Sequence, residues 1–97
     1  MNSVEVLIPV DHPSVAGHFP GNPIIPGAVL LSEVVAAWHD IGNTQGVVTL
    51  RTAKFLSPTR PGDRVAIEFD GSPTGSVKFT CSVGTTVVAS GTLSSAP

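Results

Sequence analysis

The sequence predicts an α+β fold in which a curved antiparallel sheet wraps around one apolar helix. Three observations predict it: one long apolar segment with helix start and stop signals, about five strand-like segments around it, and short Gly- and Pro-rich turns between the later strands. The chain has 97 residues, of which 41% are hydrophobic, and this suits one small core. We therefore expect a single domain over residues 1–97.

The first strand is expected at Val4 to Val10, where β-branched residues dominate and Pro9 stands near the end. Residues 11–26 follow and contain four prolines. Each proline removes an N–H donor and biases the residue before it toward extended backbone. We therefore expect a loop here rather than a helix.

The helix is expected to begin at Pro26 and Gly27 and to continue to Ile41, just before a Gly42-Asn43 stop signal. Proline is favoured in the first turn of a helix because its missing N–H has no partner there in any case. Apolar side chains cover most directions around this segment. Such a pattern predicts a buried helix rather than a surface one.

The remaining chain predicts four strands, because apolar and polar residues alternate and short turns separate the segments. Val77, Phe79 and Cys81, for example, alternate with polar residues, so the lone cysteine is expected to be a small buried side chain. Short connections predict that the last strands form an antiparallel meander. The expected strands are residues 47–55, 64–69, 76–83 and 86–93.

The low charge of the chain predicts a self-association surface. Only 12% of its residues are charged, whereas an ordinary domain carries roughly a quarter. A single sheet around one helix leaves a sheet edge and part of the helix uncovered, and a second copy can cover both. The net charge of −2 and the five Lys and Arg residues argue against a nucleic-acid partner, which needs a basic stripe.

Location and metal content are also constrained. The lone cysteine cannot form an internal disulfide, and the N-terminus lacks the pattern of a signal peptide, so we expect a cytoplasmic protein. The longest apolar stretch, residues 24–38, is interrupted and falls short of the roughly 20 residues that cross a bilayer. Asp11, His12 and His18 lack a recognisable ligand spacing, so no metal site is expected.

Two segments carry a resemblance to a known family. Residues 17–27 read Gly-His-Phe-Pro-Gly-Asn-Pro-Ile-Ile-Pro-Gly and lead into the expected helix. Residues 54–63 read Lys-Phe-Leu-Ser-Pro-Thr-Arg-Pro-Gly-Asp. In this order they resemble the active-site blocks of the hot-dog-fold (3R)-hydroxyacyl-acyl carrier protein dehydratases, the FabZ/FabA group. The chain is most similar to the short members of aryl-polyene and pigment pathways.

The resemblance implies a hot-dog fold and a hydro-lyase of fatty-acid-like, polyketide or pigment biosynthesis. Such an enzyme removes water from a 3-hydroxyacyl thioester to give the trans-2-enoyl thioester and uses no cofactor. The implied carrier of the substrate is an acyl carrier protein, with coenzyme A as the second choice. Carrier proteins of this kind are acidic, and Lys54, Arg60 and Arg64 surround one turn, where we expect a docking patch.

The resemblance also assigns roles to residues at the start of the helix. His18 matches the family's catalytic base, and an imidazole suits this role because it titrates near neutral pH. Backbone N–H groups of Gly27 and Ala28 would stabilise the negative charge that develops on the thioester oxygen. Phe19 and Pro26 complete the implied substrate-binding residues.

The chain departs from the family at the second catalytic group. The family has a Glu or Asp fourteen positions after the histidine, and Ser32 occupies that position here. Glu33 follows, but one residue is about 100° around a helix. Three explanations are open: Glu33 serves as the acid after a local register change, Ser32 acts with a water molecule, or another hot-dog subunit supplies the acid.

Two other functions remain open from the sequence. A hot-dog acyl thioesterase would act on the same class of substrate with water, and it would depend on Glu33 more than on His18. A non-catalytic subunit would instead complete the site of a heteromeric dehydratase. Such a subunit would be inactive alone and active after mixing with its partner. The chain is therefore expected to form a homodimer or a heterodimer with another hot-dog subunit.

Overall fold

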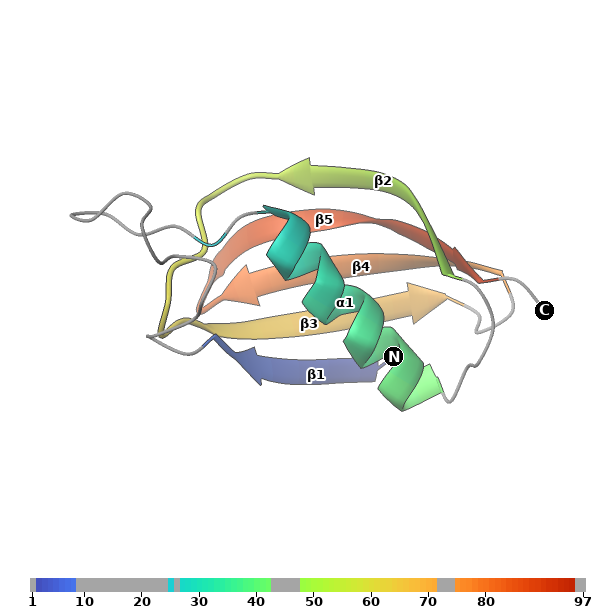
Figure 1. The fold of residues 1–97 in the computed structure, drawn as a ribbon, viewed down its shortest axis with the longest axis horizontal. Coiled ribbons are helices and arrows are strands. Elements are labelled where there is room, and N and C mark those ends of the chain that lie inside the picture. Colours follow the sequence, from blue (N-terminus) through green and yellow to red (C-terminus); the bar gives the residue numbers. More distant parts are fainter. Residues whose placement is uncertain (1, 9–24, 26, 43–47, 72–74, 96–97) are drawn as a thin grey trace.

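The computed structural model describes residues 2–8, 25, 27–42, 48–71 and 75–95. Five antiparallel strands form one sheet in the order β1-β3-β4-β5-β2, and one helix crosses a face of this sheet obliquely (Figure 1). This arrangement confirms the predicted α+β fold. The elements are β1 (Asn2–Leu7), α1 (Gly27–Gly42), β2 (Val48–Phe55), β3 (Arg64–Gly71), β4 (Ser76–Val83) and β5 (Thr86–Ser95).

The helix α1 is buried along one face only. Leu30, Val34 and Trp38 repeat at a spacing of four residues and are all buried, which is the pattern of an amphipathic helix on a core. The Trp38 ring packs on Phe69 of β3, with ring centroids 5.0 Å apart. Ser32 lies on the opposite, exposed face. The prediction of a helix buried on all sides is therefore wrong within one subunit, because a single sheet can cover only one side of it.

The inner face of the sheet supplies the rest of the core. Ile67 of β3 pairs with Cys81 of β4, and Phe69 pairs with Phe79, so that residues two apart on each strand share this face. All four side chains are buried, as the alternation in the sequence predicts. The polar residues between them, Glu68 and Thr80, point to the other face, where Glu68 is exposed and Thr80 is half-buried.

The first strand is displaced from its predicted position. Strand β1 covers Asn2–Leu7, and its register with β3 ends where Leu7 pairs with Arg64. Beyond that pair the Ile8 N–H donates to the Asp63 carbonyl at 2.9 Å, and the Ile8 carbonyl accepts from the Gly62 N–H at 2.6 Å. These two bonds hold Ile8 to the turn before β3 rather than to the β3 ladder. Residues 9 and 10 lie outside the described residues.

The burial of Cys81 gives a test of the core. Removal from water raises the pKa of its thiol from the ordinary value of 9.0 to about 11. The unfolded chain therefore loses its thiol proton before the folded chain does. The thiol's contribution to the free energy of unfolding is fully present below pH 9.0, and it is lost as the pH rises toward about 11. We expect a total loss of about 3 kcal/mol in the free energy of unfolding.

The measurement is urea unfolding at several pH values between 8 and 12, with Cys81→Ala as the reference protein. Other groups titrate equally in both proteins, so the difference between the two curves isolates the thiol. If the parent and Cys81→Ala lose stability in parallel through this range, the thiol is ionising in the folded protein and the explanation from burial is wrong.

Candidate functional site

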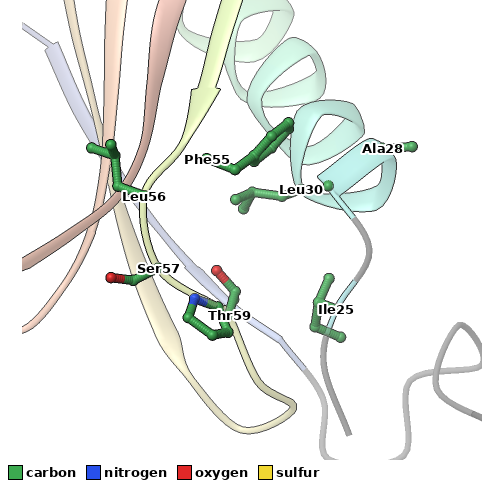
Figure 2. Close-up of a pocket in the computed structure, with 9 residues that line it drawn as sticks. Ile25, Ala28, Leu30, Phe55, Leu56, Ser57 and Thr59 are labelled. Atoms are coloured by element: carbon green, nitrogen blue, oxygen red, sulfur yellow. The ribbon is translucent and has the colours of Figure 1, made fainter. Parts of the chain in front are cut away.

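A cavity of about 640 Å³ opens where α1 begins and β2 ends (Figure 2). One wall comes from the start of the helix and the other from the chain that leaves β2, so two distant parts of the sequence form it together. We refer to it as the helix-start cavity. Its lining residues are Ile25, Gly27, Ala28, Leu30, Phe55, Leu56, Ser57, Pro58 and Thr59.

Two contacts hold the walls of this cavity together. The Ile25 N–H donates to the Thr59 carbonyl at 2.7 Å, which ties a residue two positions before α1 to the β2–β3 connection. The Phe55 ring lies against Gly27, since a Cβ atom at Gly27 would come within 2.7 Å of it. Glycine thus allows the aromatic ring to approach the helix start closely.

The chemistry of this cavity combines apolar walls with backbone donors. Leu30 and Phe55 supply apolar surface, and Leu56 beside them is 56% exposed. The N–H groups of the first helical turn lack partners inside the helix and carry a partial positive charge. An elongated apolar ligand with one oxygen that becomes negatively charged fits such a site.

Thr59 brings a buried hydroxyl to the same cavity. Its side chain is 3% exposed, and no atom of the described residues hydrogen-bonds to Oγ1. Nearly all buried polar groups in proteins have partners, and leaving one without costs about 1–3 kcal/mol. The sequence analysis missed this residue, because a threonine in a proline-rich turn normally faces water.

The two candidate acids do not line the helix-start cavity. The Ser32 hydroxyl donates to the Ala28 carbonyl at 3.0 Å and is exposed on the outer face of α1. Glu33, the next residue, is half-buried on the flank of the helix. Ser32 instead lines a second hollow of about 500 Å³, the outer helix groove, formed by Ala28, Leu31, Ser32, Val35 and Ala36.

Other residues of the predicted site lie outside the described residues, namely His18, Phe19 and Pro26. Ile25 and Gly27 flank Pro26 and both line the cavity, so the described chain meets the predicted catalytic segment at this wall. Across residues 2–8, 25, 27–42, 48–71 and 75–95, no three His, Cys, Asp or Glu side chains come together as metal ligands.

The expected docking patch consists of three exposed cations near the cavity. Arg64 forms an ion pair with Glu5, with Nη1 and Oε1 3.2 Å apart, and both side chains are exposed. The Asp63 carboxylate accepts the backbone N–H of Arg60 at 2.8 Å and so helps to shape the turn. Lys54 and Arg60 are exposed and flank residues 55–59 in the sequence, but each lines a hollow other than the helix-start cavity.

A comparison of the sequence with models of known protein families identifies the family of this chain. The model of the ApeI-like family, described as ApeI dehydratase, matches residues 2–92. The chain belongs to the ApeI-like dehydratase family. Curated relatives of this ApeI-like chain include the 3-hydroxyacyl-[acyl-carrier-protein] dehydratase FabZ of Levilactobacillus brevis, 34% identical over 79% of the chain and 60% of the relative. The FabZ of Caulobacter vibrioides is 32% identical over 65% of the chain and 46% of the relative.

The ApeI-like chain thus spans about half to 60% of the length of these curated relatives. Among solved structures, the dehydratase heterocomplex ApeI:P of Xenorhabdus doucetiae matches with a TM-score of 0.77 and 15% identity, over 98% of this chain and 86% of that chain. A 1,4-dihydroxy-2-naphthoyl-CoA thioesterase of Synechocystis matches with a TM-score of 0.60 and 12% identity, over 97% and 79%. These similarities confirm the hot-dog fold, which dehydratases and thioesterases share.

No helix among the described residues is long and apolar enough to cross a membrane.

The contact between Phe55 and Gly27 can be tested by a double-mutant cycle. In Gly27→Ala the new methyl group displaces the Phe55 ring, which is 53% exposed and free to swing outward. We therefore expect Phe55→Ala to cost less stability in the Gly27→Ala background than in the parent, with a coupling of about 0.5–1 kcal/mol. Urea unfolding of the four proteins measures this coupling.

The matched control combines Gly27→Ala with Leu50→Ala. Leu50 is also an exposed apolar residue of β2 but lies at its other end, so these two changes should add within about 0.3–0.5 kcal/mol. If the stability changes of Gly27→Ala and Phe55→Ala also added, the Phe55 ring would not rest on Gly27.

Proposed function

We propose that this chain dehydrates a 3-hydroxyacyl thioester to the trans-2-enoyl thioester in the cytoplasm. The acyl group would be carried by an acyl carrier protein, with coenzyme A as the second choice. The observation that carries the proposal is an apolar cavity at the first turn of α1, directly after the segment that contains His18, in a chain of the ApeI-like dehydratase family. The curated FabZ relatives are named for the same reaction.

In this mechanism the acyl chain lies along Leu30 and Phe55, with its thioester oxygen at the N–H groups of Gly27 and Ala28. His18 takes the proton from C2, and negative charge moves onto the thioester oxygen, where these N–H groups stabilise it. The electron pair then forms the bond between C2 and C3, and the C3 hydroxyl leaves with a proton as water. Phe19 and Pro26 complete the substrate site, and no cofactor takes part.

The source of the second proton is the open point of the mechanism. The helix α1 is continuous from Gly27 to Gly42, so Glu33 stays about 100° from Ser32 around its axis. The Ser32 hydroxyl faces outward and donates to Ala28. Neither side chain lines the helix-start cavity of its own subunit. We therefore favour a group from a second subunit as the acid.

We propose that the second subunit is another hot-dog chain, either a copy of this one or a related protein. The outer helix groove is almost entirely apolar, and Leu50 and Phe55 are exposed on the edge strand β2. Exposed apolar side chains beside an open sheet edge favour association. The solved ApeI:P structure is that of a dehydratase heterocomplex, which supports a heterodimer as one form.

An acyl carrier protein is the second proposed partner. Lys54 and Arg60 are exposed and flank the lining residues 55–59 in the sequence, and the exposed Arg64 pairs with Glu5. Docking there would bring a thioester to the cavity mouth, and the charges would act mainly on the rate of encounter.

The catalytic proposal is tested with 3-hydroxyacyl and 2-enoyl thioesters, by following hydration and thioester hydrolysis in the same samples. We expect His18→Ala to lower kcat/KM for dehydration by at least about 100-fold, because it removes the general base. Ser32→Asp should raise the rate if position 32 faces the reacting groups across the subunit contact. Ser32→Ala is its control, since it removes the bond to Ala28 and adds no acid.

Two results would contradict this proposal. If the parent and Ser32→Asp were both inactive in either direction, alone and with a pathway partner, the chain is not a dehydratase. If the parent instead hydrolysed the thioester, and Glu33→Gln abolished this while His18→Ala did not, the chain is a thioesterase.

The proposed subunit contact is tested by Ala36→Glu. Ala36 is exposed in the outer helix groove, and glutamate forms helix well, so the monomer should remain folded. A buried unpaired carboxylate is costly, and we expect the dimer dissociation constant to rise by at least tenfold. Sedimentation equilibrium measures it for the chain alone and mixed with a related hot-dog subunit.

Thr86→Glu is the matched control, because Thr86 is exposed at the β4–β5 turn, outside the outer helix groove. Equal dissociation constants for the parent, Ala36→Glu and Thr86→Glu would show that the subunit contact does not involve this groove.

A further inference from the structure

The hydroxyl of Thr59 is the starting point for a further inference about the helix-start cavity. It is closed off from bulk solvent, and none of the described residues hydrogen-bonds to it. Figure 2 shows the Thr59 oxygen on the side of the residue that faces Leu30 and Phe55. A valine of the same shape would fill this place without leaving a donor unsatisfied. The threonine is therefore better explained by a bound group than by packing.

The other lining residues restrict what that group is. Among the described lining residues, Ser57 is the only other one with a polar side chain, and its oxygen points away from the cavity (Figure 2). None of these described lining residues is charged. A ligand beside Thr59 is therefore apolar along most of its length and carries a neutral polar atom at this point.

A backbone hydrogen bond of Thr59 indicates which part of the ligand carries the polar atom that its hydroxyl would contact. The Thr59 carbonyl is bonded to the Ile25 N–H at 2.7 Å. Ile25 precedes Gly27 by two residues, which span at most about 7 Å of chain. Thr59 is therefore close to the N–H groups that would hold the thioester oxygen. In a 3-hydroxyacyl thioester, the C3 oxygen is the polar atom closest to that end of the acyl chain.

We propose that the Thr59 hydroxyl donates a hydrogen bond to the C3 oxygen of the acyl chain and makes the site selective for 3-hydroxyacyl over saturated acyl groups. This contact rests on the proposed function, because it assumes that the acyl chain occupies the helix-start cavity. A donor on the C3 oxygen also stabilises that atom as its bond to carbon breaks. It thus assists the reaction at the point where Ser32, turned outward, does not.

The test measures binding in the His18→Ala background, so that neither ligand is converted. The probes are the N-acetylcysteamine thioesters of (3R)-3-hydroxyhexanoate and hexanoate, which differ only at C3. We expect about tenfold tighter binding of the hydroxylated probe. Thr59→Val should remove this preference and leave hexanoyl binding unchanged, whereas Thr59→Ser, which keeps the hydroxyl, should retain most of it. Urea unfolding should show Thr59→Val to be as stable as the parent or more stable.

Each other result overturns the inference. An unchanged preference in Thr59→Val would show that its hydroxyl does not contact the C3 oxygen, while acyl binding itself would leave the proposed function standing. A large loss of stability in Thr59→Val would show that the hydroxyl serves the fold. If neither probe bound the His18→Ala protein, the proposed function would fail and this contact with it.

Discussion

The packing of one face of α1 on the sheet is the constraint on which the rest of this structure depends. Trp38 against Phe69, with Leu30 and Val34 beside them, fixes both the direction of the helix and its rotation about its axis. This rotation decides which residues face the core and which face outward. A helix of this length on a five-stranded sheet can bury only one side, so the outer helix groove is a direct consequence of the core.

The same packing places the start of α1 beside the end of β2. There the Ile25–Thr59 hydrogen bond and the Phe55 ring on Gly27 join two parts of the chain that are far apart in the sequence. The resulting cavity is therefore a property of the tertiary structure, because neither segment encloses it alone. Described residues of both family-like segments line this cavity: Ile25 and Gly27 from residues 17–27, and residues 55–59 from residues 54–63.

The fold was largely predictable from the sequence, and the site only in part. Alternation in β3 and β4 is a local signal, and it predicted the burial of Cys81 correctly. The end of β1 was not predictable, since it depends on hydrogen bonds from Ile8 to a turn more than fifty residues later. The burial of Thr59 was missed for the same reason. The outward position of Ser32 required knowledge of which helix face the sheet covers. The assignment of His18 stays a prediction.

Association and catalysis involve the same surface of this protein. Ser32 occupies the position where the family resemblance expects an acid, and it lies in the outer helix groove rather than in the cavity. A subunit that covers this groove for its apolar area would also come into direct contact with position 32. The small fraction of charged residues in the chain favours the packing of a second subunit on this groove. Hence a partner selected by hydrophobic packing would also determine which proton donor is present. Activity would then depend on the identity of the partner as well as on this chain.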